Sequence, residues 1–144
     1  MDARRAAWWR AEEGRVSAFV VVLTAGLLAL AGLGLDGGLA LAAKVRATGQ
    51  AESAARAGAQ AIDLAAYRET GALRLIPADA DALARTYLAG VGATGEVTAT
   101  VDTVSVTVTT SRRTQLLSLI GIPSIDAHGS GAAHPQRGVT ALEP

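Results

Sequence analysis

The side chains best suited to acid–base or metal chemistry lie close together near the C-terminus. They are Ser124, Asp126, His128 and His134. The even spacing of the two histidines would place both on one face of a strand, but two neutral imidazoles alone make a poor metal site. Ser124, Asp126 and His128 do not make a catalytic triad either, because closeness along a strand does not create the triad's spatial geometry. We therefore predict two exposed histidines, no catalytic or metal-binding residues and no cofactor.

The composition argues against several other kinds of functional site. The chain has no cysteine, so it can form neither a disulfide nor a thiolate site. Thirteen basic residues balance thirteen acidic ones, and nothing indicates the basic face that a nucleic-acid partner would require. The glycine-rich segment 32–38 lacks the strand–loop–helix setting of a phosphate loop. These features favour a structural or binding protein over an enzyme.

An apolar run near the N-terminus is the strongest pattern in the sequence. Residues 16–35 contain no charged side chain, and a helix of about 20 residues spans the roughly 30 Å hydrocarbon core of a bilayer. The run therefore predicts a transmembrane helix. A buried helix of a soluble protein is the alternative, but the rest of the chain is too small and too rich in alanine to surround it. Asp36, directly after the run, either marks the membrane exit or pairs with a basic group of a partner helix.

Basic residues around the run predict its orientation. Four arginines precede it, whereas only Lys44 and Arg46 follow close behind. The positive-inside rule then places residues 1–15 in the cytoplasm and the C-terminal part outside, in a single-pass protein of the cell membrane. A cleaved secretory signal, which would release a soluble domain, is the alternative. The run is longer than the apolar region of a usual signal, and the small-residue site at 40–42 comes only after Asp36 and two glycines.

The helix is expected to continue beyond the membrane. Residues 36–67 contain no proline and are rich in alanine, the strongest helix former. Small residues recur along this extension in steps of four and three, which is the spacing of a heptad stripe. This candidate packing stripe comprises Ala47, Ala51, Ala54, Gly58, Ala61 and Ala65. It would allow another helix, including a like helix, or a sheet to approach closely, although chance alignment in an alanine-rich segment is the alternative.

The pattern of residues 68–134 predicts a small α+β head. Pro77 opens a helix with two aspartates in its first turn, which suits the helix dipole. Two strictly alternating stretches predict half-buried strands of an antiparallel sheet, and a third, glycine-containing strand is placed at a sheet edge. The expected elements are helices over 77–90 and 113–119 and strands over 96–101, 104–109 and 122–133. Residues 135–144 are predicted to form a disordered tail.

Two motifs resemble TadE/TadG-type proteins of the tight-adherence (Flp) type IV pilus system. Residues 13–19, Glu-Gly-Arg-Val-Ser-Ala-Phe, precede the apolar run, and Leu35-Asp36-Gly37-Gly38 leads into residues 42–52, Ala-Ala-Lys-Val-Arg-Ala-Thr-Gly-Gln-Ala-Glu. The resemblance covers residues 12 to about 60 and continues more loosely through the strands. It implies a transmembrane helix, an alanine-rich continuation and a variable outer domain, with other pilus components as partners. The composition also resembles that of a high-GC actinobacterium.

The same resemblance implies a prepilin-peptidase site between Gly14 and Arg15. Pilins of this class usually have glutamate five residues after the cut, where this chain has Phe19. TadG-type members commonly lack that glutamate as well. The sequence therefore predicts a membrane-anchored, pilin-like accessory protein with a structural role, and the alternative is a membrane-anchored extracytoplasmic binding or sensor module.

Overall fold

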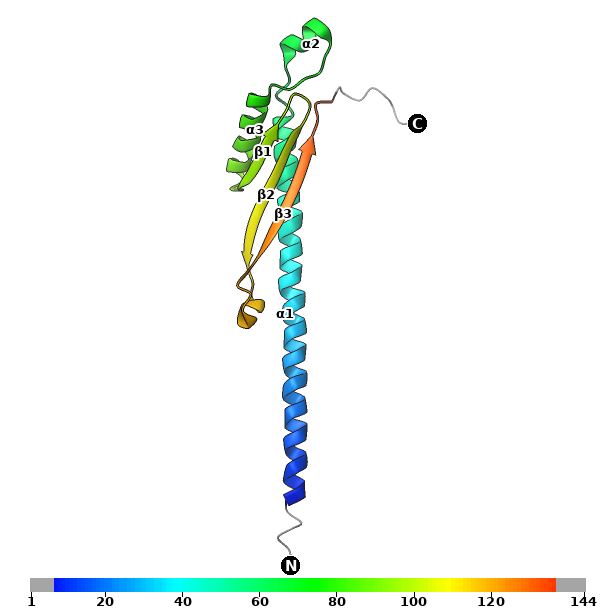
Figure 1. Cartoon of the computed structure of the whole chain (residues 1–144), viewed down its shortest axis with the longest axis vertical. Coiled ribbons are helices and arrows are strands. Elements are labelled where there is room, and N and C mark those ends of the chain that lie inside the picture. Colours follow the sequence, from blue (N-terminus) through cyan, green and yellow to red (C-terminus); the bar gives the residue numbers. More distant parts are fainter. Residues whose placement is uncertain (1–6, 137–144) are drawn as a thin grey trace, which may run out of the picture. The chain divides into compact units, whose positions relative to one another are not determined.

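The computed structural model describes residues 7–136, without the side chains of residues 7–16 and of Ile120. It confirms the predicted α+β class, with a long N-terminal helix and a three-stranded antiparallel sheet (Figure 1). The elements are α1 (Ala7–Gly58), α2 (Leu64–Thr70), α3 (Pro77–Gly90), β1 (Gly95–Ala99), β2 (Val104–Arg113), the 3-10 helix η1 (Leu117–Ile120) and β3 (Ser124–Ala133).

The chain forms two compact units. The helix–loop unit consists of α1 up to Gly38 and the loop Thr114–Pro123. The sheet unit consists of Leu39–Arg113 and the chain from Ser124 onward. The alanine-rich part of α1 therefore belongs to the same unit as the sheet, as one of its core elements.

Most of the apolar run of helix α1 is not covered by protein. It is the one helix of residues 7–136 that is long and apolar enough to cross a membrane. Phe19 and Leu30 are 66% and 67% exposed, and most other large apolar side chains of the run are similarly uncovered. A core helix of a soluble protein would bury these side chains, so the structure does not fit the buried-helix alternative.

Helix α1 is shorter than predicted, since it ends at Gly58 and not at Tyr67. The chain leaves the helix so that Ile62 forms an isolated antiparallel bridge with Leu75. Asp63 then starts the separate helix α2 as its N-cap, and its Oδ1 accepts two backbone N–H groups at 3.0 Å each. A continuous helix was predicted from the alanine content, because helix propensity takes no account of the bridge to Leu75.

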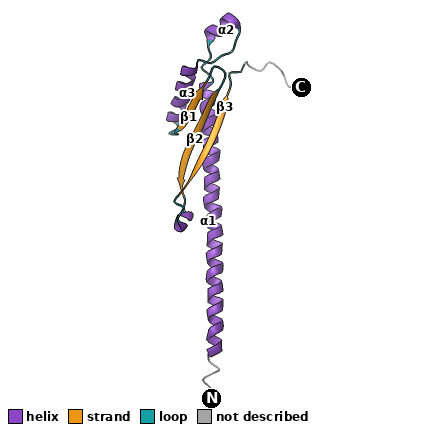
Figure 2. Cartoon of the chain, viewed as in Figure 1, coloured by secondary structure: helices purple, strands orange, loops and turns teal. Residues whose placement is uncertain are grey.

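The sheet has the order β1-β2-β3 with antiparallel pairing throughout (Figure 2). β3 is an edge strand, as predicted. β2 is longer than predicted and extends to Arg113, because residues 109–113 pair with the first half of β3. This pairing replaces the start of the helix predicted over 113–119, of which only the short η1 remains.

One face of the sheet is packed against helices and the other is open. β2 contributes three valines to the covered face. β3 contributes mainly small residues there, two of them glycines, together with the half-buried Ile125. The helices contribute mainly alanines, so this core is built from small side chains brought very close together. Its fully or nearly fully buried members include Ala47, Ala51, Ala54, Ala80, Ala84, Val104, Val106 and Val108.

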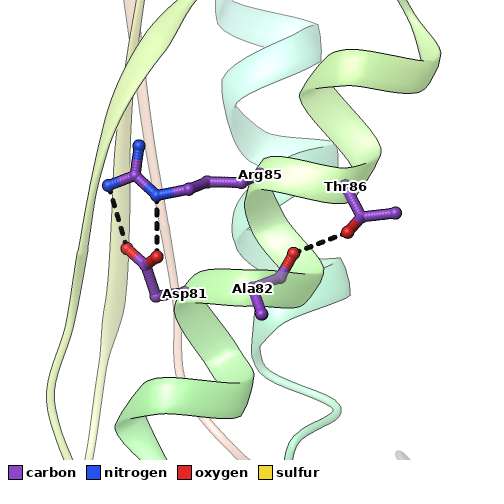
Figure 3. A network of polar contacts seen from close by, with 4 residues as sticks. All are labelled: Asp81, Ala82, Arg85 and Thr86. Atoms are coloured by element: carbon purple, nitrogen blue, oxygen red, sulfur yellow. Dashed lines mark hydrogen bonds and ion pairs between the residues drawn. The ribbon is translucent and has the colours of Figure 1, made fainter.

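Helix α3 carries an ion pair on its exposed side (Figure 3). Arg85 donates from Nε and Nη2 to the two carboxylate oxygens of Asp81, at 2.7 and 3.1 Å. Thr86 Oγ1 donates to the Ala82 carbonyl oxygen at 2.8 Å. The hydrogen bonds and the charge of Asp81 raise the pKa of the Arg85 guanidinium. A solvent-exposed pair of this kind contributes little to stability, so α3 is held in place by its buried side chains, Ala80, Ala84 and Leu88.

Candidate functional site

The residues considered for acid–base chemistry lie on the open face and beyond the end of β3. Both histidines are exposed, as predicted, and each lies against a threonine. His128 Nδ1 is 3.1 Å from Thr109 Oγ1, and His134 Nδ1 is 2.9 Å from Thr103 Oγ1. Ser124 and Asp126 are exposed on the same strand. Within residues 7–136, no group of three or more His, Cys, Asp or Glu side chains is arranged to hold a metal.

Asp36 stands out because a distant loop of the same unit binds its carboxylate. Its Oδ1 accepts the backbone N–H of Gln115 at 2.7 Å, and its Oδ2 accepts those of Leu116 and Leu117 at 2.9 and 2.7 Å. The residue is only 2% exposed. Three N–H donors replace the water that the buried carboxylate has lost, and they favour its ionised form. We call Asp36 together with the loop Thr114–Pro123 the Asp36 clamp.

The clamp gives Asp36 a partner that the sequence did not indicate. A basic group of a partner helix was one expectation, whereas the structure supplies backbone amides of the same chain. These amides lie 79 to 81 residues further along the sequence. The only signal in the sequence was the position of an acid directly after an apolar run, where an ionisable group needs a partner.

The loop of the clamp is closed at its base by Thr114. The Thr114 N–H donates to the Pro123 carbonyl oxygen at 3.1 Å, and its hydroxyl donates to the Ile122 carbonyl oxygen. Gly121 has a φ of 91°, a left-handed conformation that glycine adopts without strain. Its N–H donates to the Ser118 carbonyl oxygen at 3.2 Å. The loop is therefore a compact turn with its own internal hydrogen bonds.

The loop also packs against the apolar run of α1. A methyl group on Gly32 would lie 2.9 Å from Leu116 Cβ, so the missing side chain allows Leu116 to sit directly on the helix. Beside this contact lies an apolar groove of about 520 Å³ between the Ala25–Leu33 stretch of α1 and the leucines of the loop. Leu119 borders the groove and is 81% exposed.

The candidate packing stripe is divided between different surroundings. Ala47, Ala51, Ala54 and Gly58 are buried in the sheet unit, Ala61 is half-buried and Ala65 is exposed on α2. The close approach that the stripe predicted does occur, and the partner is the chain's own sheet.

Glycines of β3 complete this contact. A methyl group on Gly131 would lie 2.5 Å from the backbone nitrogen of Glu52, and one on Gly129 would overlap the backbone of Ala47 and Thr48. In the sequence, these two glycines served only to place the strand at a sheet edge. The structure shows that they also let the helix backbone lie against the sheet.

The candidate cleavage site, Gly14 and Arg15, lies within α1, but its side chains are outside the described residues. In the clamp, the Asp36 carboxylate accepts hydrogen bonds from three backbone amides of the loop and thereby positions it.

Comparisons of the chain with protein-family models, with curated proteins and with solved structures find no match. The proposed function therefore rests on the sequence and structure of this chain.

Proposed function

We propose that the protein is a membrane-anchored, pilin-like accessory protein, similar to TadG-type proteins, of a tight-adherence pilus or a related secretion apparatus. Its role is structural. The observation that carries the proposal is the continuous helix α1. Most of its apolar run is uncovered, and its alanine-rich part is a core element of a small α+β unit. A transmembrane helix, an alanine-rich continuation and an outer domain are the three parts that the resemblance implies.

In this proposal residues 16–35 cross the cell membrane and the sheet unit lies outside the cytoplasm. The excess of arginine before the run supports the orientation. The exposure of the large apolar side chains supports lipid as their surroundings. Phe19 stands where filament-forming pilins usually have glutamate, which favours an accessory role over a place in the filament. That role does not require cleavage between Gly14 and Arg15.

Deletion of the protein in its native host tests the proposed function. We expect surface pili, counted by electron microscopy, to be lost, and the full-length chain supplied in trans to restore them. In the complemented strain, a photocrosslinker at an exposed position of the sheet unit, such as Thr107, should capture other pilus components. Unchanged pili together with no pilus component in the crosslinks would contradict the proposal and favour an anchored binding or sensor module.

A further inference from the structure

We propose that the loop Thr114–Pro123 is a second membrane contact, which inserts its apolar side chains among the lipid acyl chains beside α1. The inference rests on the proposed crossing of the membrane by residues 16–35. It adds a second buried segment to the single transmembrane helix and assigns Asp36 the task of holding that segment in place.

The composition and exposure of the loop support insertion. Its ten residues, Thr-Gln-Leu-Leu-Ser-Leu-Ile-Gly-Ile-Pro, include five large aliphatic side chains and no charged one. Leu119 is 81% exposed, and Leu116 and Ile122 are also exposed. In water these side chains would leave a patch of apolar surface uncovered, at a cost of about 25 cal/mol for each Å². Lipid removes that cost without any further protein partner.

The position of the loop on α1 identifies lipid as the occupant of the apolar groove. Leu116 rests on Gly32, which lies four residues before Asp36 and therefore about 6 Å along the helix on its apolar side. The groove itself follows the helix from Leu33 back to Ala25, entirely within residues 16–35. If those residues cross the bilayer, the groove and the leucines that border it face acyl chains.

Most backbone N–H groups of the loop have hydrogen-bond partners within the chain, as a lipid environment requires. Irregular backbone is costly in hydrocarbon because its N–H and C=O groups lack water. Asp36 accepts three of the loop's N–H groups, and carbonyl oxygens of the loop accept four more. Pro123, at the end of the loop, has no N–H to satisfy. The donors with these partners are the backbone amides of Thr114, Gln115, Leu116, Leu117, Leu119, Gly121 and Ile122.

Site-specific fluorescence in lipid vesicles tests the inference. The chain has no cysteine, so single-cysteine variants of the full chain can be labelled with an environment-sensitive dye without background. Leu119→Cys reports on the loop, Leu28→Cys is the lipid reference on α1, and Thr107→Cys on the open face of β2 is the aqueous control. All three side chains are exposed, so the substitutions should leave the fold intact.

We expect the label at position 119 to behave like that at position 28. Lipids carrying a nitroxide near the headgroup end of the acyl chain should quench the label at position 119. Aqueous iodide should quench that label several-fold less than the label at position 107. Iodide quenching equal to that at position 107 would overturn the inference, and so would shielding from both quenchers, which would mean that protein covers the loop. Water access at position 28 as well would instead refute the proposed crossing of the membrane on which the inference depends.

Discussion

Replacing Gly129 with valine should strongly destabilise the sheet unit. The inward side of β3 at this position meets the backbone of α1 at Ala47 and Thr48, and even a methyl group would overlap those atoms. Backbone atoms cannot rotate away as a side chain can, so strand and helix would have to separate. We expect a loss of about 3 kcal/mol in the free energy of unfolding, at the upper end of usual overpacking costs. Denaturant unfolding of the full chain in detergent, followed by circular dichroism, measures it.

Ser130→Val provides the matched control for this substitution. Ser130 is the next residue of the same strand, and it is exposed on the open face of the sheet. Valine favours strands, so the control should change the free energy of unfolding by no more than about 0.5 kcal/mol. If the valine variants at positions 129 and 130 were equally stable, the close packing of β3 on α1 would be wrong.

Asp36→Ala should release the loop Thr114–Pro123 from α1. The substitution leaves three backbone amides without their acceptor, at residues 115, 116 and 117. Hydrogen bonds to a charged group contribute about 1.5–3 kcal/mol each. Partial rehydration of the amides returns some of this energy, so we expect amide hydrogen exchange at Leu117 to accelerate on the order of 100-fold. Hydrogen exchange on the chain in lipid nanodiscs reads this site directly.

Asp81→Ala controls for the removal of a carboxylate as such. Asp81 pairs with Arg85 on the exposed side of α3 and has no role in the clamp. Loss of the pair should lower the free energy of unfolding by at most about 0.5 kcal/mol and leave amide hydrogen exchange at Leu117 unchanged. If exchange at Leu117 were also unchanged in Asp36→Ala, the loop would be held by its own turn and the clamp would be unnecessary.

Local signals in the sequence were sufficient to predict several helices and strands. Proline and Asp79 predicted the start of α3 at Pro77, because both lie in the first helical turn; Asp81, expected there too, lies beyond it. Alternating polar and apolar residues predicted β1 and the first part of β2, because one face of the sheet is buried. The edge position of β3 followed from its glycines. Each of these predictions used only neighbouring residues.

Contacts between distant segments explain what the sequence did not predict. The break in the alanine-rich helix depends on the bridge between Ile62 and Leu75, which overrides the helix propensity of alanine. The extension of β2 to Arg113 depends on pairing with β3. The partner of Asp36 lies about eighty residues away along the chain. None of these interactions leaves a local pattern that could be recognised in the sequence of either segment alone.

Reporter fusions test the central claim, that α1 crosses the membrane with the N-terminus inside, most directly. An alkaline phosphatase that is active only outside the cytoplasm can be fused after the C-terminus or after Ala11 in the intact host. The excess of arginine before the apolar run predicts an active C-terminal fusion and a silent fusion at Ala11. The reverse pattern, or a C-terminal fusion that is inactive although it is stably produced, would contradict the claim.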